Sequence, residues 1–328
     1  MATEQPKKRI NWGIIGLGNI AHKFAKDLSQ ITDAKLYAVA SRSQEKANEF
    51  AALYQSEKAY DSYQALALDN QVDAVYIATP HTLHMENTLL CLKHGIAVLC
   101  EKPFAMNAEE VEQMIEMAKA QNTLLMEALW TYFLPHYQHV LQLLKAETYG
   151  KLLKLEADFG FYRAFDDQSR LFNKSLGGGS LLDIGIYPIF AALSTLGEPH
   201  DIEAKATFFE NGADSSCSMI FNYNSGVKAF LKSTLLENTP IEATYCCENA
   251  TIRINGGWHG PSAVSIIEGD SEKTLDFGYK TNGYYYEILH FNDLIRQGQK
   301  ESPIMTFDFS KKLIQLLDQV RQIINLDY

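Results

Sequence analysis

The sequence predicts an α/β fold in two parts: a Rossmann-type doubly wound parallel sheet, then an α+β domain with a large open, mostly antiparallel sheet. Short apolar runs alternate with helical patterns from Ile10 to about Ala128, as in a parallel sheet with crossover helices. A glycine-rich turn follows the first of these runs. Beyond Trp130 the chain changes to successive strand-like segments separated by turns.

The chain is long enough for both parts. It has 328 residues, of which 46% are hydrophobic, so two domains with separate cores are expected. The predicted ranges are 1–128 and 129–328, and the C-terminal helix is a candidate to pack back on the first domain.

In the first domain, each predicted strand is a short apolar run. The strand candidates are Ile10–Ile15, Lys35–Ala40, Lys58–Tyr60, Ala74–Ala78, Ala97–Cys100 and Leu124–Ala128. An amphipathic helix after the first strand is indicated by apolar residues at helical spacing, namely Ile20, Phe24, Leu28 and Ile31. These patterns together predict strands that alternate with helices.

Capping signals mark the ends of further helices in the first domain. Asn107, followed three residues later by Glu110, forms a capping box that predicts a helix running to about Ala120. Asp61 is a candidate cap for a shorter helix, and Gly95 is a candidate helix terminator before the fifth strand.

The second domain begins with helices and continues with strands. Helices are predicted over Pro135–Lys145 and Ser180–Leu196, and two more around Tyr285–Gln297 and Asp308–Asn325 close the chain. The strand candidates are Asp201–Glu210, Ser215–Tyr223, Val227–Leu236, Ile241–Glu248 and Ala263–Glu268. Sequential strands predict an antiparallel sheet. Since too few helices remain to cover both of its faces, we expect a homodimer or a higher homo-oligomer.

Composition excludes several classes of partner. A net charge of −11 argues against nucleic acid, which is bound through surplus Lys and Arg. The polar start and the short apolar stretch after it predict neither a signal peptide nor a membrane span. Five cysteines without Cys-x-x-Cys spacing favour buried thiols in a reducing cytoplasm. His81 and His84 have no further ligand at a supportive spacing, so no metal site is expected and the partner is predicted to be a small molecule.

The glycine-rich turn matches a dinucleotide fingerprint in its required setting, between an apolar strand and an amphipathic helix. Gly16-Leu17-Gly18-Asn19-Ile20-Ala21 fits Gly-x-Gly-x-x-Gly/Ala. Gly16 permits the tight turn, Gly18 lets the backbone approach a pyrophosphate, and Ala21 keeps the helix close to the strand. The first domain is therefore predicted to bind NAD(P).

The end of the second strand favours NADP over NAD. NAD-preferring sites usually place a carboxylate there, whereas this strand runs into Ser41-Arg42-Ser43. A guanidinium between two hydroxyls suits a 2′-phosphate, because charge-assisted hydrogen bonds favour that group. An ordinary solvated arginine is the alternative, and NAD stays possible.

Lys102 follows the fifth strand candidate within Glu101-Lys102-Pro103. In an open α/β sheet the ligand lies outside the carboxyl ends of the strands, so a cation at this position points toward bound ligand. Pro103 biases Lys102 toward an extended backbone. The alternative is an exposed lysine at a strand–loop junction.

The segment Gly177-Gly178-Gly179-Ser180-Leu181-Leu182-Asp183-Ile184-Gly185-Ile186-Tyr187 is the second unusual feature. If it is helical after the glycines, Asp183 and Tyr187 share a face, although Pro188 requires a first-turn position or a kink. Taken singly, Asp183 is better explained as a charge at a helix N-terminus and Tyr187 as a core aromatic. Together with Lys102 they suit oxidation of an alcohol, since an ammonium favours the phenolate that accepts the hydroxyl proton.

These motifs resemble the Gfo/Idh/MocA oxidoreductases over essentially the whole chain. The resemblance is carried by the fingerprint, by Thr79-Pro80-His81-x-x-His84, by Glu101-Lys102-Pro103 and by the glycine-rich segment through Tyr187. Tyr187 stands where many members have a histidine. This departure is similar to the subgroup that contains dihydrodiol dehydrogenase and glucose-fructose oxidoreductase, which the segments Glu127–Pro135 and Arg170-Leu171-Phe172 also resemble.

The resemblance implies an NADP(H)-preferring enzyme that transfers hydride between nicotinamide and a secondary alcohol or carbonyl of a sugar or cyclic diol. It implies that Lys102 is essential, that Tyr187 is the acid/base, that Asp183 orients the substrate or Lys102, and that Pro103 is a candidate cis proline. The expected cofactor-binding residues are Gly16, Gly18, Asn19, Ile20, Ser41, Arg42, Thr79, Pro80, His84, Glu101 and Lys102. Two alternatives stay open, a non-catalytic nucleotide-binding sensor and an NAD-dependent glycosidase.

Overall fold

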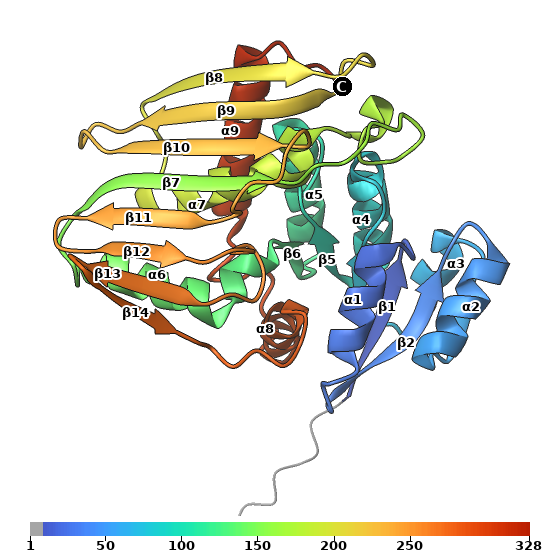
Figure 1. Ribbon diagram of the computed structural model, residues 1–328. Coiled ribbons are helices and arrows are strands. Elements are labelled where there is room, and N and C mark those ends of the chain that lie inside the picture. Colours follow the sequence, from blue (N-terminus) through green and yellow to red (C-terminus); the bar gives the residue numbers. More distant parts are fainter. Residues whose placement is uncertain (1–8) are drawn as a thin grey trace, which may run out of the picture. The chain divides into compact units, whose positions relative to one another are not determined.

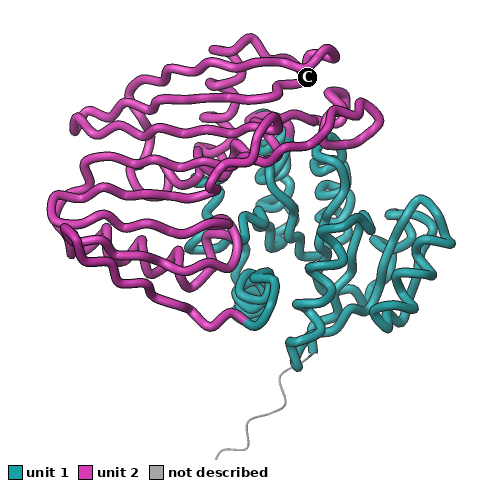
Figure 2. Tube along the Cα trace, viewed as in Figure 1, with its two compact units in different colours: residues 1–105, 109–130, 280–310 teal, residues 106–108, 131–279, 311–328 magenta. Residues whose placement is uncertain are grey.

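The computed structural model describes residues 9–328 (Figure 1). The prediction that the chain has no targeting segment rests on residues before position 9, which lie outside the described residues. The chain forms two compact units (Figure 2). Unit 1 comprises the described part of Met1–Ala105 together with Glu109–Trp130 and Lys280–Ser310, and unit 2 comprises Met106–Ala108, Thr131–Tyr279 and Lys311–Tyr328. The domain ranges 1–128 and 129–328 stay a prediction.

Unit 1 contains a parallel six-stranded sheet in the order β3-β2-β1-β4-β5-β6. Its strands are β1 Ile10–Ile15, β2 Ala34–Ala40, β3 Lys58–Tyr60, β4 Ala74–Ile77, β5 Ala97–Glu101 and β6 Leu125–Ala128. The helices between them are α1 Asn19–Leu28, α2 Gln44–Tyr54, α3 Tyr63–Ala67, α4 His84–Lys93 and α5 Ala108–Ala120. This sheet confirms the predicted Rossmann fold. Its central strands are buried on both faces, which explains the near-continuous apolar runs in the sequence.

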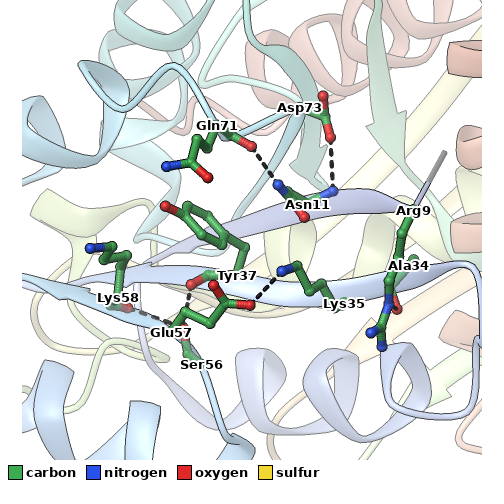
Figure 3. Close-up of polar contacts among 10 residues, drawn as sticks. All are labelled: Arg9, Asn11, Ala34, Lys35, Tyr37, Ser56, Glu57, Lys58, Gln71 and Asp73. Carbon is green, nitrogen blue, oxygen red and sulfur yellow. Dashed lines mark hydrogen bonds and ion pairs between the residues drawn. The ribbon is translucent and has the colours of Figure 1, made fainter.

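Polar contacts fix the sheet at the ends where its strands begin (Figure 3). The backbone N–H of Asn11 donates to Asp73 (2.9 Å), and the Asn11 side-chain amide donates to the carbonyl of Gln71 (2.8 Å). Arg9 Nε donates to the carbonyl of Ala34 (3.0 Å), so β1 is tied to segments at the start of both neighbouring strands. These contacts lie at the end of the sheet opposite to the carboxyl ends of its strands.

Helix α8, Tyr284–Arg296, belongs to unit 1 although it lies far along the chain. The Asp27 carboxylate of α1 accepts the backbone N–H groups of Asn282 (3.0 Å) and Tyr285 (3.1 Å), which satisfies donors at the start of α8. The indole N–H of Trp12 donates to Asn292 (3.0 Å), and Trp12 also packs against Phe291. Burial of these aromatic rings holds α8 on unit 1.

Unit 2 contains an eight-stranded sheet in the order β14-β13-β12-β11-β7-β10-β9-β8 (Figure 1). Its strands are β7 Leu152–Gly160, β8 Asp201–Phe208, β9 Asp214–Asn222, β10 Lys228–Thr234, β11 Ala243–Cys247, β12 Thr251–Ile254, β13 Val264–Glu268 and β14 Ser271–Leu275. All neighbours are antiparallel except β7 and β10, which confirms a mostly antiparallel sheet. Helix α6, Pro135–Lys145, contacts β12, and helix α7, Ile186–Leu196, contacts β7 and β10.

Three strands of unit 2 escaped sequence analysis. In β7, charged Lys154 and Glu156 alternate with the buried Leu155 and Ala157. The pattern has the period of a strand, but its polar half masks the apolar half. Strand β12 is only four residues long, and the edge strand β14 is exposed and charged, so neither shows an apolar run.

Two local predictions were corrected by the structure. Helix α3 is capped by Ser62, whose hydroxyl accepts the N–H of Ala65, and not by Asp61. The helix predicted over Ser180–Leu196 begins with a π-helical turn, Leu181–Gly185, before α7. Pro188 lies in the first turn of α7, where a missing N–H costs little. The stretch Lys174–Leu196 is apolar enough to cross a membrane by composition alone, but 89% of its most apolar window is buried, as in a core helix.

Two more of the predicted helices are present in the structure. The capping-box prediction matches α5, and α9, Phe307–Ile323, follows α8 near the end of the chain. Five cysteines are present, all as free thiols; Cys91, Cys100 and Cys217 are buried, whereas Cys246 and Cys247 are only partly buried.

Candidate active site

The cofactor-binding candidates of unit 1 lie after four strands, at one edge of the parallel sheet. Gly16 follows β1, Ser41 follows β2, Thr79 follows β4 and Lys102 follows β5. The strand order reverses direction between β1 and β4. Ligands of open α/β sheets bind outside the carboxyl ends of the strands at such a switch point, so the sheet brings these residues to the expected crevice.

The fingerprint glycines have different structural reasons. Gly16 has φ +89°, and a Cβ there would lie 2.6 Å from the backbone of Ala78. Gly16 is therefore required by the fold itself. Gly18 has φ −86°, and an added Cβ would meet nothing within 4 Å. The fold does not require a glycine at position 18, so its reason must lie in the space beside it.

That space suits a pyrophosphate. Gly18 is the N-cap of α1, and no side chain caps the helix. The first backbone N–H groups of α1 therefore lack a side-chain acceptor, and the helix dipole favours negative charge there. Asn19 is exposed and Ile20 partly exposed at the start of the same helix. The residues present fit the diphosphate of a dinucleotide.

The end of β2 presents a cation. Arg42 is exposed, and Ser41 and Ser43 are partly exposed on either side of it. Ser43 caps α2 by accepting the N–H of Lys46 (3.4 Å), so its hydroxyl already has a structural partner. Burial raises the pKa of Tyr63, and the positive charge of Arg42 opposes that effect.

His84 ties two of these loops together. It is fully buried, and its ring nitrogens lie 2.8 Å from the carbonyl oxygen of Pro103 and 3.0 Å from that of Thr79. The loop after β4 and the loop after β5 are thus joined through one imidazole. As a cofactor-binding residue His84 stays a prediction, and its observed contacts are with the loops themselves. Pro80, between them, is partly exposed.

Lys102 stands between two anchored neighbours. Glu101, at the end of β5, is buried and accepts the hydroxyl of Tyr76. The Lys102–Pro103 peptide bond is cis, as the family resemblance implied, and Pro103 is buried. Lys102 itself is partly exposed. Its backbone is therefore fixed on both sides while its side chain retains access to the surface.

Below this loop lies a second carboxyl group. Glu127 on β6 is buried and accepts the N–H of Phe104 (3.0 Å). Burial raises the pKa of Glu127 to about 7, against hydrogen bonds from Ser310 and Phe104. The loop that carries Lys102 thus rests on a carboxyl that binds a proton more readily than usual.

In unit 2, Asp183 and Tyr187 lie on the π-helical turn and the start of α7. Asp183 is largely buried and forms an ion pair with Arg170 (3.1 Å). The Tyr187 side chain is buried. Among the described residues, its ring neighbours include Phe159 (5.5 Å between centroids), His259 (5.1 Å) and Trp258 (6.4 Å). Tyr187 therefore sits in an aromatic wall.

Asp214, which sequence analysis missed, holds this helix start in place. It is fully buried, and its Oδ2 accepts the hydroxyl of Ser180 (2.6 Å) and the N–H of Leu181 (2.7 Å). A Cβ on Gly179 would lie 2.1 Å from Asp214 Oδ1, and Gly179 has φ +125°. The glycine is thus required for close approach to Asp214. Burial raises the pKa of Asp214 to about 6.

The other glycines of the segment pack against the chain's own loop. A Cβ on Gly178 would lie 2.7 Å from the backbone of Arg170 and of Asn173. Close approach was predicted for these glycines, and the groups they approach are protein groups. Asp214 was not predicted because it follows the turn Asn211-Gly212. From the sequence alone, an acidic residue beside a turn looks like an ordinary turn residue.

The structure thus gathers the cofactor candidates in unit 1 and the acid/base candidates in unit 2. Gly16, Gly18, Asn19, Ile20, Ser41, Arg42, Thr79, Pro80, Glu101 and Lys102 lie at or after the ends of β1, β2, β4 and β5. Asp183 and Tyr187 lie together on one helix start. Of the aromatic residues that were candidates for a pocket or for core packing, Trp130 is buried and stacked on Tyr284 within unit 1. Among residues 9–328, no group of three or more His, Cys, Asp or Glu is arranged to hold a metal ion.

Two family models match the chain. The first, described as an oxidoreductase family with an NAD-binding Rossmann fold, matches residues 10–129. The second, described as a GFO/IDH/MocA C-terminal domain, matches residues 137–253. The two matches cover the parallel sheet and the first part of the antiparallel sheet.

Curated relatives match over nearly the whole length. The chain is 35% identical to trans-1,2-dihydrobenzene-1,2-diol dehydrogenase of Xenopus tropicalis, with 97% of this chain and 98% of the relative covered. It is 34% identical, with the same coverage, to the scyllo-inositol 2-dehydrogenase (NADP(+)) IolU of Bacillus subtilis. A solved structure of KijD10, a 3-ketoreductase from Actinomadura kijaniata in complex with NADP and TDP-benzene, is 26% identical. It has a TM-score of 0.86 and covers 96% of this chain and 98% of that one.

Proposed function

Since this chain belongs to the Gfo/Idh/MocA family of oxidoreductases, we propose that it is an NADP(H)-preferring enzyme acting on a cyclic diol or a sugar. It is an NAD(P)-linked oxidoreductase of sugar or diol substrates, as its relatives of similar length are. The observation that carries the finer proposal is the row of Gly18, Arg42 and Lys102 along one edge of the parallel sheet. That edge offers groups for a pyrophosphate, a 2′-phosphate and a reacting oxygen.

The nicotinamide, when bound, supplies the hydride acceptor or donor. Gly18 and the start of α1 would hold the pyrophosphate of the cofactor, and residues of the loops after β4 and β5 would bind other parts of it. Lys102 binds the reacting oxygen of the substrate, because its backbone is anchored by Glu101 and Pro103 and the residue is partly exposed. Its positive charge stabilises negative charge on that oxygen.

Tyr187 exchanges the proton. In the direction of oxidation, the substrate hydroxyl gives its proton to the deprotonated oxygen of Tyr187 as the hydride leaves carbon. Asp183 orients the substrate, with its charge balanced by Arg170 (3.1 Å). The role of Lys102 in unit 1 and the role of Tyr187 in unit 2 are both part of the proposal.

The preference for NADP rests on Arg42. Ser41-Arg42-Ser43 follows β2 directly, where NAD-preferring sites usually have a carboxylate, and the exposed guanidinium suits a 2′-phosphate. The named NADP dependence of IolU is consistent with this assignment. NAD remains the second coenzyme to test.

A cyclic substrate suits the side chains around Tyr187. Phe159 and Trp258 present aromatic surface, which favours the apolar face of a ring, whereas Asp183 and Arg170 offer polar groups for hydroxyls. Among the relatives, the named substrates are a dihydrodiol and an inositol, which are both cyclic vicinal alcohols.

A coenzyme and substrate panel tests the proposal. Purified protein is assayed at 340 nm with NADP+ or NAD+ against trans-1,2-dihydrobenzene-1,2-diol, scyllo-inositol and a set of aldoses. Lys102→Met and Tyr187→Phe should each lower kcat by about 100-fold or more, with only modest loss of NADP affinity. Most of kcat retained in either variant would remove the role assigned to that residue.

We also propose that unit 2 forms a homodimer through the open face of its sheet. A hollow of about 590 Å³ lies on this face, lined in part by Glu156, Glu203, Lys205, Phe230 and Lys232. Phe230 is 39% exposed, and acidic and basic side chains alternate around it. A surface with both charges around an apolar centre is complementary to a second copy of itself.

Sedimentation velocity tests the dimer. The wild-type chain should sediment as a dimer at micromolar concentration. Phe230→Glu should shift it to the monomer, while Phe208→Glu, on the same sheet and outside the hollow, serves as a matched exposed control. A monomeric wild type at that concentration would exclude the proposal.

We also propose that the protein is cytoplasmic, on the basis of its five free thiols. Fractionation of cells that express a tagged chain would test this location.

A further inference from the structure

A histidine lies beside the Tyr187 ring. Among the described residues, the ring neighbours of Tyr187 include Phe159, Trp258 and His259, and the last has 5.1 Å between ring centroids and 55° between ring planes. Histidine is the side chain whose charge ordinarily changes between about pH 5 and 8. Sequence analysis did not single out His259, because it lies in the loop between β12 and β13, far from the glycine-rich segment.

The loop that carries His259 is fixed from three directions within unit 2. The indole N–H of Trp258 donates to the carbonyl of Asp158 (2.8 Å). The imidazole of His136 contacts the carbonyl of Trp258 (3.0 Å), and the hydroxyl of Thr131 donates to the carbonyl of His259 (2.5 Å). The position of His259 is therefore set by several elements rather than by loop flexibility.

The His259 ring is held as well as its backbone. It stacks on Phe159 with 4.1 Å between centroids and 26° between planes. Phe159 also contacts Tyr187, so the three rings form one cluster. Stacking on one face and contact with Tyr187 restrict the ring to an orientation beside the phenol.

Burial differs along this cluster. Tyr187 is 5% exposed, whereas His259 is partly exposed and has its Nδ1 atom buried. Part of His259 is therefore accessible to solvent, whereas Tyr187 is not. A buried acid/base must return its proton to solvent in every turnover, and a side chain with this placement provides a route.

Other ionisable groups on the elements around the loop are committed elsewhere. The Asp158 carboxylate accepts the N–H groups of Ile241 (2.9 Å) and Glu242 (3.3 Å). Burial lowers the pKa of His136 to about 4, so this imidazole is neutral when it bonds Tyr279 and the loop. Asp183 is paired with Arg170.

We propose that His259 relays the catalytic proton between Tyr187 and solvent, and so acts on the reaction through Tyr187. The inference rests on the proposed role of Tyr187. In alcohol oxidation the O–H of Tyr187, formed by the substrate proton, breaks as an N–H forms on His259. The imidazolium then releases a proton to water, which restores the neutral ring and the phenolate. Reduction of a carbonyl runs the same transfers in reverse, so no oxidant beyond the nicotinamide is required.

Kinetics of two variants test the relay with trans-1,2-dihydrobenzene-1,2-diol and NADP+. His259→Gln keeps a polar side chain of similar length, and His259→Ala opens space for added imidazole. Both should lower kcat by about 10- to 100-fold with little change in KM. Free imidazole should restore the alanine variant but not the glutamine variant, and the kcat–pH profile of both should change on its acid side. His200→Ala, at an exposed histidine, is the matched control.

The relay would be overturned if His259→Gln had the same kcat–pH profile as the wild type, or if imidazole did not restore the kcat of His259→Ala. Either result would leave the proposed function intact. A readout that needs no turnover is the NMR titration of the His259 imidazole nitrogens. Tyr187→Phe should shift its midpoint and leave that of His200 unchanged. An identical His259 titration in both proteins would likewise refute the inference. If the wild type turns over none of the panel substrates, the proposed function fails and this titration still tests the coupling.

Discussion

Alanine at the two fingerprint glycines is expected to separate folding from cofactor binding. Gly16→Ala places a non-glycine residue at φ +89°, which costs about 1–2 kcal/mol. Its Cβ would also lie 2.6 Å from the backbone of Ala78 and 2.7 Å from that of Thr79. Because backbone atoms must then move, overpacking adds about 1–3 kcal/mol. The expected loss is therefore about 2–5 kcal/mol of the free energy of unfolding.

Gly18→Ala should leave the fold nearly unchanged. Its φ of −86° and ψ of −173° are open to any residue, and the new methyl group meets no protein atom within 4 Å. Alanine is a slightly poorer N-cap than glycine, so a change of less than about 1 kcal/mol is expected. The methyl group does occupy the space proposed for the pyrophosphate. A loss of NADP affinity of about tenfold or more follows, which corresponds to about 1.4 kcal/mol.

Two measurements on each variant decide the matter. Thermal unfolding followed by circular dichroism should show a Tm lower by about 5–15 °C for Gly16→Ala and nearly unchanged for Gly18→Ala. Titration of intrinsic fluorescence with NADPH should show the affinity loss in Gly18→Ala. If Gly18→Ala binds NADPH as tightly as the wild type, the pyrophosphate does not lie at this turn. A fully stable Gly16→Ala would show that the described turn is wrong.

Three other substitutions test separate parts of the structure. Arg42→Asp should change the ratio of the NADP and NAD dissociation constants by about tenfold or more in favour of NAD, measured by the same fluorescence titration, and an unchanged ratio would remove Arg42 from the 2′-phosphate site. Glu127 binds its proton more tightly in the folded state, with a pKa of about 7 against 4.5, so the free energy of unfolding should fall as the pH rises from about 4.5 to about 7. Glu127→Gln should remove that part of the slope in urea titrations at pH 5 and pH 8, and an identical slope would contradict the assignment. Asp214→Ala leaves the Ser180 hydroxyl and the Leu181 N–H without their acceptor, so it should lower the free energy of unfolding in urea by about 1–3 kcal/mol. Asp214→Asn is the milder control. Equal stability of the two variants would argue against the hydrogen bonds as the cause.

The parallel half of the fold was predictable because its signals are local. Strands buried on both faces need continuous apolar runs, and the central strands of unit 1, such as β4 and β5, have them, whereas the short edge strand β3 is partly exposed. The turn Gly16–Ala21 and the sequence Glu101-Lys102-Pro103 also lie within a few residues of the strands that position them. In unit 2, β7 is half exposed and β14 lies at an edge, so their patterns are mixed or polar and gave no strand signal.

The candidate site was predictable where residues act through chain-local geometry and hidden where they act across the fold. Asp183 and Tyr187 are four residues apart, so one helix start brings them together. Asp214 reaches this helix start from the first position of β9, and His259 reaches it from a loop 72 residues beyond Tyr187, so no spacing rule connects them. Both carry ionisable groups that a sequence explains equally well as surface residues. Their contacts distinguish them from surface residues. Asp214 lies against Gly179, which leaves room for its carboxylate, and His259 contacts both Phe159 and Tyr187. The placement of titratable groups beside a helix start is thus the physical feature that marks the acid/base half of the site, and it exists only after the antiparallel sheet has folded.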